Sequence, residues 1–330
     1  MKKILNDPKN VLDEMLNGFV YANEGLVKRL EGTGVIYRTF KDEGKVGLVS
    51  GGGSGHEPSH AGFVGQGMLS AAVCGEVFTS PTPDQIVEAI KIADQGAGVL
   101  LIVKNYTGDV MNFEMAQEMA EMENIQVEKL IVDDDIAVED STFTAGRRGI
   151  AGTVLVHKIL GAAAASGLSL EEIKTLGDQL VPNIKTIGVS ISPATVPEVG
   201  KPGFQLAEDE MEYGVGIHGE PGYRREKIKT SREIAKELVN QLKKAFNWKK
   251  GDHYAVLVNG LGATPLMEQF VFMNDVHALL KEEELVIDYK KVGSFMTSID
   301  MAGVSLTLVK LADDTWTRYL KLPVKTPAWV

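Results

Sequence analysis

His218 is the residue of this sequence whose side chain and surroundings most clearly indicate a chemical role. It lies in the stretch MEYGVGIHGEPGY, residues 211–223, a strand-like run that ends in glycines and a proline. Acidic residues flank it at Glu212 and Glu220, and the spacing around it is not that of a helix face. A neutral imidazole is a nucleophile near physiological pH, since a free histidine titrates at about 6.5. The stretch alone leaves three roles open: packed side chain, ligand or nucleophile.

A glycine run precedes a second histidine in SGGGSGHEP, residues 50–58. Glycines that follow a strand allow backbone N–H groups to approach a ligand closely. The run is not a Walker A loop, because the Gly-Lys-Ser/Thr of that motif is missing, and His56 and Glu57 stand where a dinucleotide fingerprint has its third glycine. The alternative is a tight strand-to-helix turn with Glu57 and Pro58 in the first helical turn, which leaves His56 unexplained.

Two further stretches carry candidate side chains. In VKNYTGD, residues 103–109, Lys104 and Asp109 bracket a loop rich in hydrogen-bonding groups. Loops at strand ends often carry function, but a solvated surface loop explains this stretch equally well. FTSPTPDQ, residues 78–85, is typical of a helix start with Pro and Asp in the first turn. Ser80 in this stretch is a further candidate to face the same ligand cleft as Lys104 and Asp109.

The remaining histidines indicate no metal site. His157 falls in a helical segment, His253 begins a strand and His277 lies in another helical segment, without HExxH spacing. His60 follows His56 by four residues, so a helix would place both on one face. Because no carboxylate or cysteine pattern completes a ligand set, we expect no metal there.

The acidic run VDDDIAVEDS, residues 132–141, also invites a metal assignment. Its spacing does not match an EF-hand loop, and it is interpreted as a solvated acidic turn rather than a magnesium site. The single cysteine, Cys74, excludes an intrachain disulfide and a multi-cysteine zinc site. It lies in an apolar run and is expected to be a buried, inert thiol.

Short apolar strands alternate with helical segments and would position these residues. Strands are expected at 45–50, 98–103 and 130–132, each followed by polar residues, and such strand ends are where open α/β sheets place ligands. Helices are expected at 11–30, 84–94, 111–122, 147–166 and 231–246, and a further strand begins at 253. The predicted fold class is α/β, with two α/β domains of layered sheets and flanking helices. The boundary is placed near 183, where the composition becomes rich in Gly and Pro, giving domains 1–183 and 184–330.

The bulk composition excludes several function classes. The chain has 330 residues, 44% of them hydrophobic and 24% charged, which is typical of a globular protein. A net charge of −11 argues against binding to nucleic acid or an anionic membrane, since both need clustered Lys and Arg. Neither a signal peptide nor an apolar run of about 18 residues is present, so a cytoplasmic enzyme or regulator is expected.

Longer blocks of the sequence resemble the dihydroxyacetone kinase family, in particular its substrate-binding subunit or domain. The resemblance runs nearly end to end and in matching order. It is carried by GKVGLVSGGGSGHEP, GEVFTSPTPDQI, LLIVKNYTGDVMNFE, VDDDIAV, TAGRRGIAGTVLVHKI, ATVPEVGKPGFQLAEDEMEYGVGIHGEPG and LVNGLGATPL.

The resemblance implies a fold, an assembly and a site. The fold is the family's pair of α/β domains in a homodimer, with the glycine loop in the first domain and the covalent histidine in the second. His218 would add to the ketone carbon of dihydroxyacetone to give a hemiaminal, and His56 would be the proton acceptor. The substrate-binding positions that carry over are Gly53, Ser54, Gly55, His56, Lys104 and Asp109.

The resemblance also implies partners, because the sequence contains no ATP-binding motif. It points to the stand-alone subunit of a multi-component enzyme, with no cofactor of its own. A separate kinase subunit would carry ADP or ATP with magnesium, and a phosphoenolpyruvate-dependent phosphotransferase subunit would recharge it indirectly. Two alternatives stay open: a dihydroxyacetone-sensing paralogue that acts as coactivator of a transcription regulator, and a kinase subunit for a related triose or erythrulose.

Overall fold

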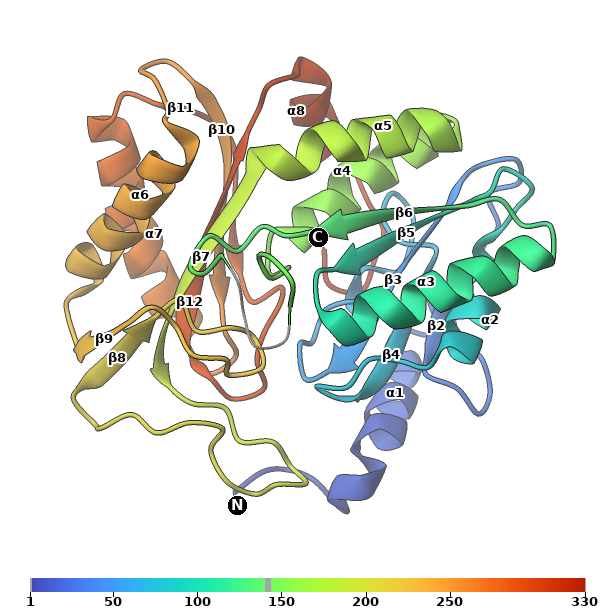
Figure 1. Ribbon diagram of the computed structural model, residues 1–330, viewed down its shortest axis with the longest axis horizontal. Coiled ribbons are helices and arrows are strands. Elements are labelled where there is room, and N and C mark those ends of the chain that lie inside the picture. The colour runs from blue at the N-terminus through green and yellow to red at the C-terminus, as the bar shows by residue number, and fades with distance from the viewer. Residues whose placement is uncertain (1, 140–143, 330) are drawn as a thin grey trace.

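Two β-sheets flanked by helices form the framework of the chain (Figure 1). The computed structural model describes residues 2–139 and 144–329, and over these residues each sheet has six strands. The predicted α/β class with layered sheets is therefore confirmed. Every strand of the first sheet precedes the predicted boundary at 183, and every strand of the second follows it. Within the described residues, no helix is long and apolar enough to cross a membrane.

The first sheet has the strand order β1-β2-β4-β3-β5-β6. Its strands are β1 (Val27–Arg29), β2 (Val35–Arg38), β3 (Gly47–Ser54), β4 (Ala71–Val77), β5 (Val99–Lys104) and β6 (Val127–Val132). The four strands β4, β3, β5 and β6 are parallel, so their carboxyl ends meet at one edge. That edge is where ligands bind in open α/β sheets.

Alternate residues of these strands enter two different cores, as the two-residue period of a strand requires. Leu101 packs with α2 (Pro83–Ala93) and α3 (Thr107–Met122). Its neighbour Leu100 points to the opposite face, toward α1 (Val11–Ala22), α4 (Thr153–Ala165) and α5 (Leu170–Leu180). The central strands are buried on both faces, which explains their continuous apolar sequences.

The second sheet has the order β11-β10-β12-β7-β8-β9 and is mostly antiparallel. Its strands are β7 (Ile184–Ser192), β8 (Glu210–Tyr213), β9 (Arg224–Lys227), β10 (His253–Gly260), β11 (Val286–Gly293) and β12 (Ala302–Lys310). One face is covered by α6 (Ser231–Phe246) and α7 (Leu266–Glu282). Short 3₁₀ turns occur at Pro8–Asn10, Ala61–Phe63 and Val181–Asn183.

The two sheets share one hydrophobic core. Leu100 of the first sheet, Leu155 of α4 and Leu257 of the second sheet belong to the same buried cluster, together with Trp316 of α8 (Asp314–Lys321). Helices α4 and α8 therefore lie between the sheets, as Figure 1 shows. This shared core fixes the loops of one sheet against those of the other.

Three predicted helices have different starts or ends. The helix expected at 11–30 ends at Ala22, because Gly25 takes φ 86° and the chain turns into β1. The helix expected at 111–122 begins earlier, at Thr107. The helix expected at 147–166 begins only at Thr153, because the N–H groups of Ile150 and Gly152 donate to the carboxylate of Asp134.

Candidate active site

His218 and His56 meet although they come from different sheets. The Nε2 atoms of the two rings are 3.1 Å apart. His56 follows the end of β3, and His218 lies in the loop between β8 and β9. His56 is fully buried, whereas the side chain of His218 keeps 20% of its surface exposed. The imidazole of His218 is thus the one of the pair that is open to solvent.

The other ring nitrogen of each histidine has an oxygen partner that only accepts. Nδ1 of His56 donates to the carbonyl oxygen of Thr297 at 2.7 Å, and Nδ1 of His218 donates to Oε1 of Glu220 at 3.1 Å. Both Nδ1 atoms therefore carry hydrogen. A hydrogen bond between the two Nε2 atoms then requires one additional proton, which one of the rings must hold.

The environment of His56 favours its neutral form. Burial is the main cause that lowers the pKa of His56 well below its usual value, and the charges of His218 and Lys104 lower it further. The carbonyl of Thr297 opposes this shift only in part. A neutral imidazole with hydrogen on Nδ1 keeps a lone pair on Nε2, the atom that faces His218. His56 is thus prepared to accept a proton at that atom.

Glu220 holds His218 by two contacts. Its Oε2 accepts the backbone N–H of His218 at 2.9 Å, while Oε1 accepts from the ring. Burial by itself raises the pKa of Glu220, but the hydrogen bond and charge of His218, helped by the charge of Arg148, outweigh burial and leave this pKa below its usual value. The sequence shows Glu220 next to His218 but does not reveal this contact.

A buried ion pair supports the loop that carries His218. Arg148 is fully buried, and its Nε lies 2.8 Å from Oδ2 of Asp135. Its Nη2 donates to the carbonyl of Gly214 at 2.7 Å. Because Asp135 follows β6, this pair ties the loop after β8 to the carboxyl edge of the first sheet.

Two aromatic rings enclose the histidine pair. The ring of Tyr106 packs edge-on against His218 at a centroid distance of 4.6 Å, and Phe78 packs against it at 5.1 Å. Phe78 also stacks on His56 at 5.1 Å. The sequence did not single out either ring, although both lie inside the stretches FTSPTPDQ and VKNYTGD.

A cleft of about 730 Å³ opens beside His218. It is lined by Gly53, Phe78, Thr79, Ser80, Tyr106, Thr107, Gly108, Asp109, Asn112 and His218. Of the predicted site residues, Gly53, Ser80, Asp109 and His218 thus border one space. The hydroxyl of Ser54 instead donates to the carbonyl of Gly75 at 2.7 Å.

Asp109 and Lys104 lie side by side below the glycine run. Asp109 stands in the first turn of α3, where a helix favours negative charge, and its Oδ1 accepts from the hydroxyl of Ser80. Nζ of Lys104 is 3.7 Å from Oδ2 of Asp109 and donates to the carbonyl of Gly51 at 3.0 Å. With 1% and 4% of their surfaces exposed, Lys104 and Asp109 do not belong to a solvated surface loop. A direct contact of Lys104 with a ligand stays a prediction.

The glycine run itself is part of β3, not a turn into a helix. A Cβ atom at Gly52 would lie 2.5 Å from Nζ of Lys104, so this position has no room for a side chain. The carbonyl of Gly55 accepts the N–H of Ile299 at 2.7 Å. The segment between β11 and β12 thereby holds the glycine run and His56 in place.

The structure leaves no ring nitrogen of His56 or His60 for a metal. The Nδ1 and Nε2 atoms of His60 contact His157 and Lys104 at 2.9 Å each, and those of His56 contact Thr297 and His218. Residues 56–60 form a turn, so the helical face considered from the sequence does not exist. Across residues 2–139 and 144–329, no group of three or more His, Cys, Asp or Glu side chains could hold a metal ion.

The solvated-turn interpretation of the acidic run is wrong for two of its residues. Asp134 and Asp135 each have 1% of their surface exposed, because Asp134 holds the start of α4 and Asp135 pairs with Arg148. Burial is the main cause that raises the pKa of Asp134, to about 6. The last two residues of the run, 140 and 141, lie outside the described residues. Cys74 is buried as expected, and burial raises the pKa of its thiol to about 12.

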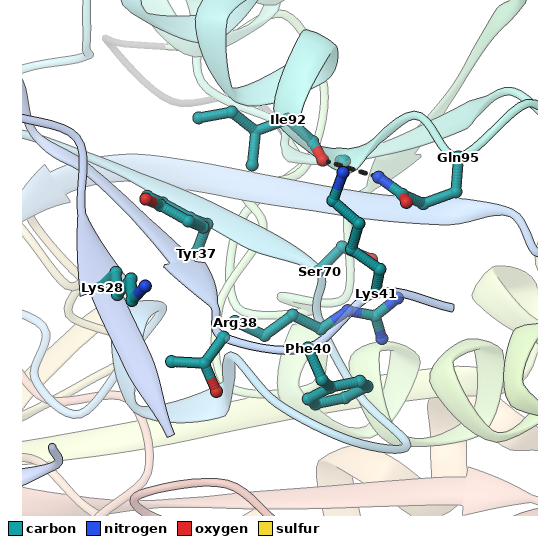
Figure 2. A pocket seen from close by; sticks show the side chains of 10 residues that line it. Lys28, Tyr37, Arg38, Phe40, Lys41, Ser70, Ile92 and Gln95 are labelled. Atoms are coloured by element: carbon teal, nitrogen blue, oxygen red, sulfur yellow. Dashed lines mark hydrogen bonds between the residues drawn. The ribbon is translucent and has the colours of Figure 1, made fainter. Parts of the chain in front are cut away.

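A second cavity, of about 220 Å³, has a different character (Figure 2). It lies beside β2 and includes Lys28, Arg38 and Lys41, but none of the predicted site residues. The guanidinium of Arg38 stacks on Phe40 at 4.6 Å and pairs with Asp42 at 3.2 Å. Since its most buried cation is already paired and neither His218 nor His56 lines it, we place the candidate active site in the cleft beside His218.

Comparison with known proteins gives a consistent picture. The model of the Dak1 domain family matches residues 17–328. The chain is 66% identical to the PTS-dependent dihydroxyacetone kinase, dihydroxyacetone-binding subunit DhaK of Lactococcus lactis, with 99% of both chains covered. It is 46% identical to the DhaKLM operon coactivator DhaQ of the same organism, covering 99% of this chain and 100% of that protein.

A solved structure extends the likeness to the fold. The crystal structure of the dihydroxyacetone kinase of C. freundii superposes with a TM-score of 0.92 at 35% identity. The match covers 99% of this chain and 60% of that one. The chain therefore corresponds to a part of that longer kinase.

Proposed function

The chain belongs to the Dak1 domain family, and from this premise we propose that it is the dihydroxyacetone-binding subunit of a PTS-dependent dihydroxyacetone kinase. The observation that carries the proposal is the contact of His218 with His56 and Glu220 beside a cleft lined by Asp109. The likeness to the L. lactis subunit over 99% of both chains supports it. We propose that the protein acts in the cytoplasm as a homodimer.

In the proposed first step, dihydroxyacetone becomes tethered to His218. The lone pair of Nε2 forms a bond to the ketone carbon while the π bond of the carbonyl breaks and its electrons move to oxygen. That oxygen takes the proton that the two Nε2 atoms share and becomes the hydroxyl of a hemiaminal, which leaves His56 neutral. The ring becomes cationic in this step, and the carboxylate of Glu220, which accepts from Nδ1, stabilises the cation.

A covalent tether suits so small a substrate. A ligand gains at most about 1.5 kcal/mol of binding free energy per non-hydrogen atom, so dihydroxyacetone has little noncovalent binding energy to gain. Attack at a carbonyl also discriminates against glycerol, which has none. Residues Gly53, Ser54 and Gly55 of the glycine run and Lys104 are the remaining proposed substrate-binding positions.

In the proposed second step, a terminal hydroxyl of the tethered substrate attacks a phosphoryl group. His56 accepts the proton of that hydroxyl at Nε2, with Asp109 assisting from the wall of the cleft. A partner subunit presents the terminal phosphoryl group of ATP with magnesium, ADP is the leaving group and stays on that partner, and a phosphotransferase subunit recharges it. The carbon–nitrogen bond to His218 then breaks, its electrons return to Nε2 as the hemiaminal hydroxyl loses its proton and the carbonyl reforms, and the product, dihydroxyacetone phosphate, is released.

A second candidate function is that of a dihydroxyacetone-responsive coactivator. It is favoured by the 46% identity to the coactivator DhaQ. The larger identity to the kinase subunit, 66%, favours the catalytic role. The two functions differ in one requirement: only the kinase subunit must transfer a phosphoryl group to the substrate when the partner subunits are supplied.

The test is intact-protein mass spectrometry after incubation with dihydroxyacetone and rapid desalting. The wild type should gain the mass of one substrate reversibly, and His218→Ala should gain none. His277→Ala, which changes an exposed histidine of α7, is the matched control. No adduct on the wild type would refute the tether. Adding the nucleotide-carrying and phosphotransferase subunits should then yield dihydroxyacetone phosphate; an adduct without this product would favour the coactivator.

A further inference from the structure

A chain of buried polar side chains runs from the active-site floor into the protein interior. Nζ of Lys104 lies 2.9 Å from Nε2 of His60, and Nδ1 of His60 lies 2.9 Å from Nε2 of His157. Exposed fractions are 1%, 4% and 0% for the three residues. The steps of the proposed function do not use either histidine, yet burying such groups costs free energy unless they are paired.

The contacts of Lys104 indicate the direction of the hydrogen bonds. Nζ donates a hydrogen bond to the carbonyl of Gly51 at 3.0 Å and forms a buried ion pair with a carboxylate oxygen of Asp109 at 3.7 Å, which favours the charged ammonium form of Lys104. An ammonium group has three N–H donors and no acceptor. In its 2.9 Å contact with Nζ, Nε2 of His60 must then accept, so it is the bare nitrogen of its ring.

The hydrogen positions on His60 and His157 follow from that assignment. His60 carries its hydrogen on Nδ1 and donates it to Nε2 of His157, so His157 also carries its hydrogen on Nδ1. That Nδ1 atom is buried and has no hydrogen-bond partner among the described residues. Burial, followed by the charge of Lys104, lowers the pKa of both histidines, that of His157 to about 3, which agrees with two neutral rings.

We propose that His60 and His157 are positioning residues: a relay of two neutral imidazoles, each protonated at Nδ1, holds the Lys104 ammonium against Gly51 and Asp109. Lys104 in turn fixes the glycine run and the carboxylate at the edge of the cleft. The Lys104 ammonium packs closely against the glycine run, since a Cβ atom at Gly52 would lie 2.5 Å from its Nζ. The catalytic consequence rests on the proposed function, but the relay itself does not.

The first experiment detects the relay without any activity. Long-range ¹⁵N–¹H NMR of the full-length protein with ¹⁵N-labelled histidine should show Nδ1 protonated and Nε2 bare in the rings of His60 and His157. These signals should be lost one at a time in His60→Gln and His157→Gln, whereas His277→Gln removes only an exposed ring. Hydrogen on Nε2 of His60 or His157 would mean that these hydrogen bonds run in the opposite direction and that Lys104 is neutral. That result would overturn the proposal.

The second experiment tests positioning with a matched pair of variants at a residue that does not line the cleft. In His157→Gln the amide oxygen can still accept from His60, whereas in His157→Leu nothing can. We expect the KM for dihydroxyacetone to rise about tenfold in His157→Leu and to stay near the wild-type value in His157→Gln. Equal values in the two variants would contradict the positioning role.

A pH profile provides a readout that a loss of packing would not change. Burial lowers the pKa of Lys104, with the charge of Asp109 opposing the shift. The other titratable groups around Lys104 are His56, His60 and His157. Loss of the acceptor in His60→Leu should destabilise the ammonium and move the alkaline limb of kcat/KM to lower pH by about one unit. An unchanged limb would overturn the proposal.

The outcomes separate this inference from the proposed function. If the wild type transfers no phosphoryl group, the proposed function fails, and the NMR assignment alone decides whether the relay exists. If the tautomers agree but His157→Leu retains the wild-type KM and pH profile, the positioning role is refuted while the proposed function stands.

Discussion

His56 and His218 form a hydrogen bond through their Nε2 atoms at 3.1 Å, although 162 residues separate them in the chain. The carbonyl of Thr297 and the carboxylate of Glu220 occupy the two Nδ1 atoms, so the Nε2 atoms can share only one proton. When a carbonyl carbon bonds to Nε2 of His218, this proton would move to the carbonyl oxygen, which frees the lone pair of His56. The same contact therefore links the nucleophile to the base.

Replacing His56 by Asn should separate tethering from phosphoryl transfer. The amide nitrogen of Asn can still donate to the carbonyl of Thr297, but the side chain has no basic nitrogen. We expect the dihydroxyacetone adduct on His218 to persist and the rate of phosphoryl transfer to fall about 10²–10⁴-fold, the usual contribution of a general base. Mass spectrometry and a coupled assay with the partner subunits measure the two quantities; a variant with a normal rate would rule out His56 as the base.

Replacing Glu220 by Gln should weaken the tether itself. The carboxylate accepts two donors from His218, one on each oxygen, whereas an amide has one oxygen and no charge. Since hydrogen bonds to charged groups contribute about 1.5–3 kcal/mol, we expect the adduct affinity to fall about 10- to 100-fold. Titration of the adduct by mass spectrometry measures this. Glu226→Gln in β9 is the control, and an equal loss there would point to a general effect on the loop.

The buried histidines should make the fold sensitive to acid. Burial, and then the charge of Lys104, lowers the pKa of His157 from its unfolded value of about 6.5 to about 3. Between these values the unfolded chain binds a proton that the folded chain does not. The free energy of unfolding should therefore fall as pH falls below about 6.5, by up to about 1.4 kcal/mol per pH unit for this residue.

Urea denaturation at about pH 7 and about pH 5.5 measures this dependence. His157→Gln should show a smaller loss of stability between the two pH values than the wild type. His277→Gln, which changes an exposed ring, should retain the wild-type difference. Identical differences in all three proteins would show that His157 is not held neutral in the folded state.

Replacing Gly52 by Ala should damage the site and not only the fold. Gly52 has φ 145°, and an added Cβ would lie 2.5 Å from Nζ of Lys104. Gly251 has φ 83° with nothing within 4 Å of the added atom, so Gly251→Ala reports backbone strain alone. Each change should lower the free energy of unfolding by about 1–3 kcal/mol, but only Gly52→Ala should also weaken the substrate adduct. Intact adduct formation in Gly52→Ala would mean that Lys104 can shift without cost.

Much of the framework was predictable because it depends on local sequence patterns. Helix α6 spans Ser231–Phe246, the predicted range, since its apolar spacing and the capping box at Thr230 are local signals. Helix α4 was predicted to start too early, because Asp134 engages the residues before Thr153 and its contact is not visible in the local sequence. The glycine run was expected to end its strand, whereas strand pairing with β4 extends β3 through Ser54.

The sequence by itself determined the residue types that the site has available and the strand ends that carry several of them. Because apolar periodicity and glycine placement are local properties, they drew attention to the glycine run, Lys104 and Asp109, whereas the site roles of Gly53, His56, Lys104 and Asp109 were implied by the family resemblance. The distance between His56 and His218, the tautomers set by Thr297 and Glu220, and the burial of His60 beside Lys104 were decided only by the tertiary structure. Hydrogen-bond partners and desolvation act through space, and here they join residues that are up to 241 positions apart in the chain.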